Sequence, residues 1–152
     1  MKQNFLSKNI KNILISSFGA FLCIFIIAYF NTIDKSNIWL IPPFGASLVL
    51  VMAVPDSPLA SPRNVFFGHV LSASSGVLIF YFFENSSLSI ALGLALAIMA
   101  MQLTNTVHPP AGANPIIAIL GAKTFEFVIM PVAIGASFIV LFAFIYNKIW
   151  NR

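Results

Sequence analysis

The sequence has 152 residues, of which 59% are hydrophobic and only 8% carry a formal charge, and its mean hydropathy is +0.95. This composition excludes a water-soluble domain and indicates an all-α, polytopic transmembrane helical bundle whose main partner is the lipid bilayer. The net charge of +4 does not indicate nucleic-acid binding, because the basic residues lie mainly near the two chain ends, where membrane proteins carry cytoplasmic flanks.

Four runs without a formal charge predict full transmembrane helices, at residues 13–30, 65–83, 88–106 and 128–146. With a rise of 1.5 Å per residue, each helix is roughly 27–29 Å long, close to the ~30 Å hydrocarbon core of a bilayer. The first run follows three lysines, as in a signal peptide, but it is long enough to span and no small-residue cleavage site follows it. We therefore expect it to be a mature helix.

Two shorter apolar stretches, residues 38–54 and 109–122, each contain a Pro-Pro pair followed closely by Gly-Ala. A proline pair suits the start of a helix and is excluded from its interior. Each stretch is therefore predicted to be an extended lead-in ending at Pro43 or Pro110, followed by a helix over residues 44–54 or 111–122. These helices would be about 17–18 Å long, half the thickness of the bilayer.

The two broken stretches also suggest an internal repeat. Residues 42–47 match residues 109–114 with an offset of 67, and four of the six positions are identical. The offset predicts one domain over residues 1–152, built from two halves (about 13–83 and 88–146) that each read span, broken segment, span. A chance match in a chain rich in Pro, Gly and Ala is the alternative.

The basic residues also predict the orientation. Lys2, Lys8 and Lys11 near the start, and Lys148 and Arg152 near the end, place both termini in the cytoplasm. This requires an even number of crossings. Six result if both broken segments cross the membrane, and four if both re-enter and turn back; the sequence leaves both open.

The breaks are also where a binding site is expected, because backbone without helical hydrogen bonds is tolerated in a membrane only inside protein or beside a wet cavity. Half-helix N-termini that meet near the midplane can hold an anion with their amides. The alternative is that the breaks make tight turns for close helix packing. The predicted substrate-binding residues are Gly45, Ala46, Ser47, His108, Gly112, Ala113 and Asn114.

Three further residues are predicted to shape access to this site. His69 lies about one turn into its span, and Asp56 and Arg63 lie in a loop with three prolines. His108 can donate to an anion or carry a proton, because imidazole titrates near neutral pH. The alternatives are a helix cap for His108, an interhelical hydrogen bond for His69, and ordinary solvated loop charges.

The sequence contains no Walker loop, dinucleotide-binding glycine motif, His-Glu-x-x-His or Gly-x-Ser-x-Gly motif, and its single cysteine, Cys23, is expected to be a buried packing residue. We therefore predict neither an enzyme nor a bound cofactor or metal. A Gly- and Ala-rich bundle of this size can also self-associate, although no motif specifies it.

The run His-Pro-Pro-Ala-Gly-Ala-Asn-Pro at residues 108–115 resembles the motif that names the HPP family of membrane proteins. The resemblance extends to residues 43–47 and 55–64 and to Gly68-His69. It implies a bacterial inner-membrane protein whose plastid and cyanobacterial relatives act as nitrite transporters. Some relatives carry a CBS-domain pair after the membrane region, and none is expected in this chain.

The combined hypothesis is a secondary transporter of nitrite or a similar small anion. Two alternatives remain open. The first is a passive anion or small-solute channel, and the second is a membrane scaffold or accessory subunit that transports nothing.

Overall fold

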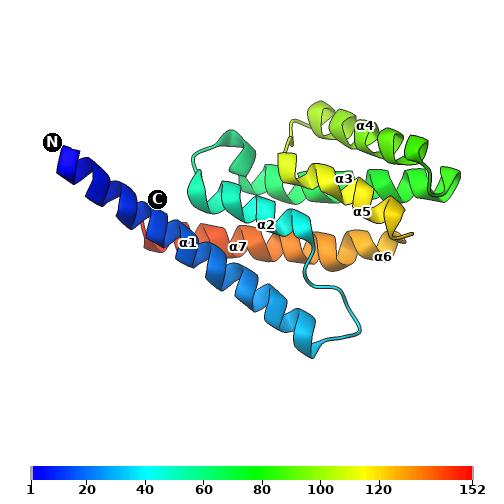
Figure 1. The fold of residues 1–152 in the computed structure, drawn as a ribbon. Helices are drawn as coiled ribbons and strands as arrows, with labels where there is room; N and C mark the ends of the chain where they lie inside the picture. The colour runs from blue at the N-terminus through cyan, green and yellow to red at the C-terminus, as the bar shows by residue number, and fades with distance from the viewer. Residues whose placement is uncertain (1, 152) are drawn as a thin grey trace.

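The computed structural model describes the backbone of residues 2–151 and the side chains of residues 10–151. Within this part of the chain the fold is all-helical, as predicted (Figure 1). The α-helices and the short 3-10 or π-helical segments, labelled η, are α1 (Lys2–Ile33), α2 (Pro42–Leu48), η1 (Val49–Ala53), η2 (Pro58–Ala60), α3 (Pro62–Phe83), α4 (Ser87–Leu103), η3 (Pro109–Ala113), α5 (Asn114–Leu120), α6 (Phe125–Phe127), η4 (Val128–Ala133) and α7 (Ile134–Ile149).

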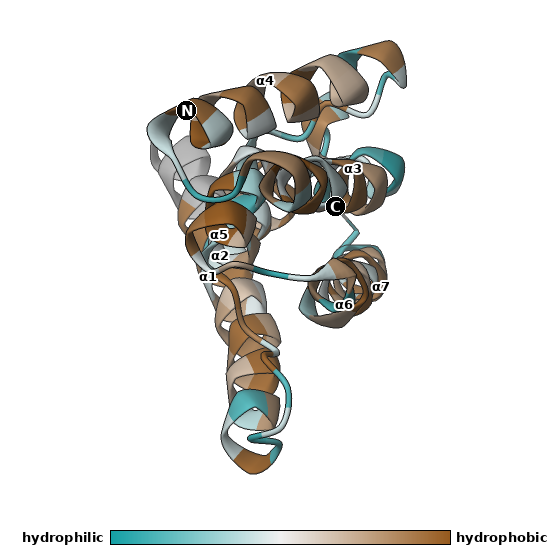
Figure 2. Cartoon of the chain, turned by 90° about the vertical axis from the view of Figure 1, so that its right-hand side faces the viewer, coloured by the Kyte–Doolittle hydropathy of each residue, from teal (hydrophilic) through white to brown (hydrophobic). Residues whose placement is uncertain are grey.

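Three of the four predicted spans are long and apolar enough to cross a bilayer: Ile10–Ile33, Pro62–Phe83 and Phe125–Ile149. Figure 2 shows the hydrophobic residues that cover these helices. The fourth, α4, has 17 residues and ends earlier than predicted. Asn105 takes a left-handed φ of 53°, and the Thr106 N–H donates to the Met101 carbonyl, which closes the helix end. The duplicated arrangement of four equal spans therefore stays a prediction.

The last span is not the continuous helix expected from residue 128 to 146. Met130 has extended backbone angles, φ −127° and ψ 118°, and Pro131 follows it inside the helical run. Proline has no N–H for the helical ladder, so the interruption falls where the sequence carries its one proline in this span. This third break was visible in the sequence and was missed.

Both Pro-Pro pairs open a short helix after an extended residue, as predicted. Ile41 (φ −127°, ψ 146°) precedes α2, and His108 (φ −136°, ψ 100°) precedes η3. The helices include the prolines themselves, because the first turn does not need the missing N–H groups. The second segment begins as a 3-10 turn and becomes α-helical only at Asn114.

The first broken segment runs from one end of the bundle to the other. At one end a cavity of about 840 Å³ is lined by Lys11, Val54 and Trp150, and at the opposite end Asn37 and Lys123 line another cavity. Figure 1 shows α2 and α5 starting near the middle and running toward opposite ends, with the two termini at the same end. The number of membrane crossings, six or four, stays a prediction, because only three helices in the described part of the chain are long and apolar enough to span a bilayer.

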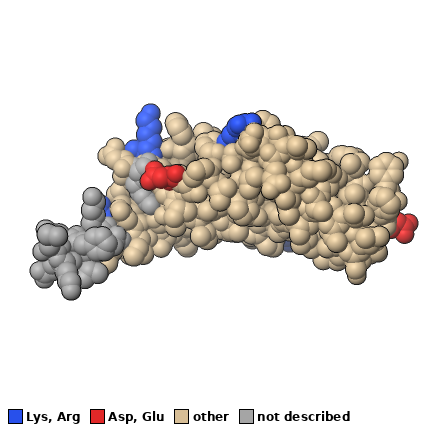
Figure 3. Space-filling model, turned by 90° about the horizontal axis from the view of Figure 1, so that it is seen from above, with Lys and Arg blue, Asp and Glu red and all other residues tan. Residues whose placement is uncertain are grey.

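The sequence prediction of which end faces the cytoplasm can be tested by labelling. Figure 3 shows charged side chains toward both ends of the molecule and one basic side chain partway along it, and the rest of this face is almost uncharged. In a Cys23→Ala background, we expect a membrane-impermeant maleimide to label Asn85→Cys in intact cells but Asn12→Cys only after permeabilisation. Cys23 is the single cysteine of the sequence, so its replacement leaves the introduced cysteine as the one thiol that can be labelled. Labelling of Asn12→Cys alone in intact cells would reverse the assigned orientation.

Helix α3 lies at the centre of the bundle and contacts α4, α5, η3, η4 and α7. Its glycines allow two close approaches. A Cβ on Gly76 would overlap the backbone Cα of Pro115, and a Cβ on Gly68 would lie 2.7 Å from the Cβ of His108. Small residues at these positions bring the second broken segment against α3, as small residues generally do in membrane helix packing.

Candidate functional site

Ser47, His69, His108 and Asn114 form one polar cluster in the interior of the bundle, and all four are fully buried. Ser47 comes from α2, His69 from α3, and His108 and Asn114 flank η3. The two broken segments therefore meet, and their meeting point contains both histidines of the chain. Buried polar and ionisable residues at membrane depth are costly and are generally functional.

Ser47 is the centre of the cluster. Its Oγ lies 2.7 Å from Nε2 of His69, 2.8 Å from Nε2 of His108 and 3.1 Å from the carbonyl oxygen of Pro43. The ring centroids of the two histidines are 5.1 Å apart. One serine hydroxyl therefore bridges both imidazoles.

The outer nitrogens of the two rings also have partners. Nδ1 of His108 lies 2.8 Å from the carbonyl oxygen of Leu59, and Nδ1 of His69 lies 2.9 Å from Nδ2 of Asn114. The Asn114 amide also donates to the backbone carbonyl of His69 at 3.1 Å. Its Oδ1 is buried without a hydrogen-bond partner, which is an uncommon state for a buried amide oxygen.

Hydrogen bonds from α3 hold the second broken segment in place. Arg63 donates to the Thr104 carbonyl at 2.8 Å, Asn64 to the Val107 carbonyl at 2.9 Å, and Ser72 to the Ala111 carbonyl. The carbonyls of Thr104 and Val107 lie beyond the end of α4, and these bonds supply donors there, as backbone at membrane depth requires, whereas Ala111 lies within η3. They fix His108 and Asn114 relative to His69.

The predicted site residues divide into two groups. Ser47, His108 and Asn114 come together, and His69, predicted to shape access, is a member of the same cluster. Gly45 and Ala46 are exposed on α2, whereas Gly112 and Ala113 are half-buried in η3. None of these four has a side chain that can donate to a ligand.

The first backbone amide after each Pro-Pro pair is bonded within its own turn. The prolines have no N–H, and the next amide in each segment already bonds the residue before the pair: Phe44 donates to Ile41, and Ala111 to His108, both at 3.0 Å. The polar groups that the structure brings together in the cluster are side chains, and an anion site at the amides of residues 45–47 and 112–114 stays a prediction.

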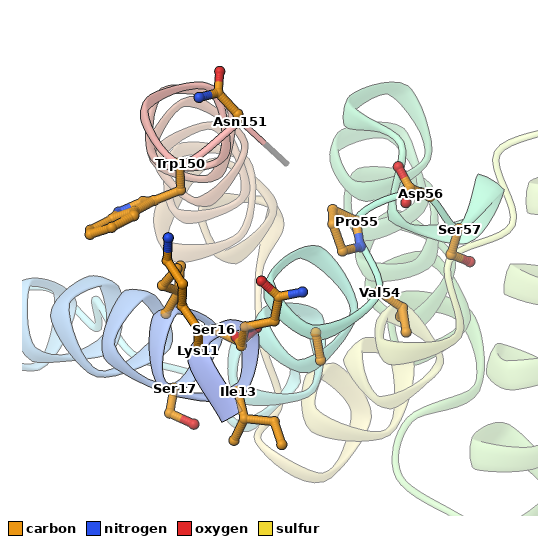
Figure 4. Close-up of a pocket in the computed structure, with 13 residues that line it drawn as sticks. Lys11, Ile13, Ser16, Ser17, Val54, Pro55, Asp56, Ser57, Trp150 and Asn151 are labelled. Carbon is orange, nitrogen blue, oxygen red and sulfur yellow. Dashed lines mark hydrogen bonds between the residues drawn. The ribbon is translucent and has the colours of Figure 1, made fainter. Parts of the chain in front are cut away.

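Asp56 and Arg63 lie outside the cluster. Asp56 is exposed and lines the 840 Å³ cavity, which Figure 4 shows bordered by Lys11 from α1, Trp150 beyond α7 and Asp56 from the loop after η1. It also lines a second cavity of about 320 Å³ together with Ala60 and Lys148. Arg63 binds the Thr104 carbonyl and so supports the broken segment.

Sequence reasoning missed the backbone carbonyls of Leu59 and Pro43, and the ring of Phe44, whose centroid is 5.5 Å from that of His69. No pattern marks a carbonyl as a partner, because every residue carries one. Among the described residues there is no group of three His, Cys, Asp or Glu side chains that would hold a metal ion.

A family model described as "HPP, transmembrane region" matches residues 6–152, nearly the whole chain. The chain belongs to the HPP family. Two proteins from Dictyostelium discoideum, each named only as a transmembrane protein, are 37% and 38% identical to this chain over 142 residues. The matches cover 88% of this chain but only 46% and 50% of those two relatives, so the chain spans about half their length. No solved structure matches this HPP protein.

Proposed function

We propose that this HPP protein transports a small inorganic anion, with nitrite as the first candidate, across a bacterial inner membrane. The observation that carries the proposal is the buried Ser47–His69–His108–Asn114 cluster at the meeting point of two broken membrane segments. Broken segments that meet at a polar site within the bilayer are typical of secondary transporters. Nitrite is chosen because plastid and cyanobacterial relatives act on it. The proposal includes no enzymatic reaction.

The side chains offer donors suited to a small oxyanion. His69 presents Nε2, Ser47 its hydroxyl and Asn114 its Nδ2 amide, all three in the interior. These groups now bond one another, so an entering anion must take over contacts that Ser47 makes. For a transporter, the passage of an anion therefore requires these contacts to separate.

Uptake into liposomes tests the proposal. Purified protein in proteoliposomes is expected to accumulate nitrite, or nitrate or formate, above vesicles without protein. Accumulation that follows an imposed pH gradient supports a coupled carrier. Transport that is insensitive to the gradient and never exceeds equilibrium favours a passive channel. If none of the three anions enters faster than in empty vesicles, the transport proposal is wrong.

The completeness of the packing favours one other function, that of a non-transporting scaffold. All four side chains are fully buried and joined by hydrogen bonds in a chain, as in a structural polar core, with Asn114 Oδ1 as the one buried side-chain atom of the cluster that has no partner. For a scaffold, the His108→Ala, Asn114→Ala double variant that still folds should leave the cell phenotype intact. For a transporter, cells with the double variant should show the same phenotype as cells from which the gene is deleted.

A further inference from the structure

The hydrogen positions in the polar cluster follow from its partners. Nδ1 of His108 faces a carbonyl, Leu59 O, which only accepts, so this nitrogen carries a hydrogen. In a neutral ring Nε2 is then bare and needs a donor, which the Ser47 hydroxyl supplies at 2.8 Å. His108 is therefore an Nδ1–H tautomer that accepts from Ser47.

The other ring has the opposite tautomer. Nδ1 of His69 faces the Asn114 amide nitrogen, a donor, so this nitrogen is bare and Nε2 carries the hydrogen. That hydrogen is donated to Ser47 at 2.7 Å. The amide orientation is independently supported, because Nδ2 also donates to the His69 carbonyl. The bonds thus run in one direction, from Asn114 through His69, Ser47 and His108 to Leu59.

A second arrangement of hydrogens fits the same heavy-atom positions. The Ser47 hydroxyl can turn to the Pro43 carbonyl, 3.1 Å away. Its oxygen then accepts from both rings, so Nε2 of His108 must carry its own hydrogen. His108 becomes an imidazolium whose two N–H groups both have acceptors, Leu59 O and Ser47 Oγ.

A protonated His69 would not have an acceptor for each of its two N–H groups. A hydrogen on its Nδ1 would point at the Asn114 amide hydrogens, so the amide would have to flip. The flip would present Oδ1 to His69 but would lose the bond to the His69 carbonyl and place two oxygens together. The geometry therefore distinguishes the two histidines, because only His108 can accept a proton without movement of a heavy atom.

We infer that His108 is the proton-binding site of the protein and that the Ser47 hydroxyl switches from His108 to Pro43 when the proton binds. A proton from water adds to Nε2 of His108, and no covalent bond between heavy atoms changes. The inference deepens the proposed transport function, on which it rests for its purpose: the proton is the coupling ion, and its charge offsets that of the anion.

The surroundings provide no other counter-charge among the described residues. The titratable group that faces His108 is His69. The charged side chains on the helices around the pair are Arg63 on α3, Glu126 on α6 and Lys148 on α7, and all three are exposed. A proton and an anion that enter together are therefore neutral as a pair, which reduces the cost of burying either one.

A route for the proton begins at the end of the bundle. Ala60, which follows the Leu59 carbonyl acceptor, lines the 320 Å³ cavity together with Asp56 and Lys148. The cavity therefore reaches the residue that follows Leu59, whose carbonyl is bonded to Nδ1 of His108.

Nitrogen-15 NMR of histidine-labelled protein in lipid nanodiscs tests the inference directly, because the chain has only two histidines. The protein is purified through a tag without histidine, and His69→Gln, whose amide can still donate to Ser47, leaves His108 as the single signal. As the pH falls, we expect Nε2 of His108 to change from a bare to a protonated nitrogen while Nδ1 stays protonated. In the wild type, His69 should keep its bare Nδ1 over that range.

Removing the switch supplies the control. Ser47→Ala leaves the second N–H of His108 without an acceptor, so its protonation should need a pH lower by about one to two units. Ser47→Thr keeps the hydroxyl and should restore the midpoint. A His108 signal that never changes before the protein unfolds, a proton that appears first on His69, or a midpoint unaffected by Ser47→Ala would each overturn the inference.

The same samples separate this inference from the transport proposal. Normal titration of His108 in a protein that moves no anion would leave the proton site in place and refute transport. Anion uptake that is unchanged in His108→Gln and carries no proton would refute the inference and leave transport in place.

Discussion

Ser47→Ala is expected to reduce anion uptake by roughly tenfold or more, the factor that about 1.4 kcal/mol of lost binding produces. The substitution removes the hydroxyl that bridges both imidazoles, leaving Nε2 of His69 and Nε2 of His108 without their partner. Unpaired buried groups cost about 1–3 kcal/mol each, although hydrogen bonds between membrane helices average nearer 0.6 kcal/mol. The free energy of unfolding in mixed micelles should therefore decrease by an amount within that range.

Ser75→Ala is the matched control, because it makes the same chemical change in a buried serine outside the cluster. Ser75 donates to the Leu71 carbonyl one turn earlier in α3, and this bond joins no other element. Uptake and stability should stay near those of the wild type. If Ser75→Ala and Ser47→Ala reduce uptake equally, the cluster has no special role in transport.

Gly76→Ala should destabilise the fold strongly, because it adds a methyl group where two backbone segments already touch. The new Cβ would overlap the Cα of Pro115 and lie 2.9 Å from its carbonyl oxygen and 3.0 Å from the Cβ of Ala118. Two of these three atoms are backbone, so α3 and α5 must separate, at a cost of about 1–3 kcal/mol for overpacking. Denaturant-induced unfolding of the detergent-solubilised protein measures this loss of stability.

Gly45→Ala should instead increase the stability of the fold slightly. No atom lies within 4 Å of a Cβ built on Gly45, and alanine is preferred over glycine in a helix by about 0.5–1 kcal/mol. We expect a slightly more stable protein with normal uptake, because Gly45 lies on α2 away from the cluster. If the variant folds normally but loses uptake, Gly45 contributes to the binding site, as the sequence predicts.

The sequence determines the local features of this fold well. Charge-free runs located the long helices, and the chemistry of Pro42 and Pro109 located both broken segments. The offset of 67 paired Ser47 with Asn114, and both lie in the cluster. These features depend on residues close in the chain.

The tertiary features could not be obtained in this way. His69 joins Ser47 across 22 positions and Asn114 across 45, and hydrophobic patterning does not specify such contacts. The partner of His108 is a backbone carbonyl, which carries no residue-specific signal. The first amide after each proline pair donates to the residue before the pair, a bond that the sequence pattern does not specify.

The bonds from α3 to the second broken segment also determine how the interior can open. Arg63, Asn64 and Ser72 join that segment to α3, and Asn114 adds a bond to the His69 backbone, so three members of the cluster belong to one rigid part of the molecule. Ser47 belongs to a different part, α2, and reaches the histidines through a single oxygen atom. If the protein transports an anion as proposed, we therefore expect α2 to move away from the part formed by α3 and the second broken segment as the solute passes.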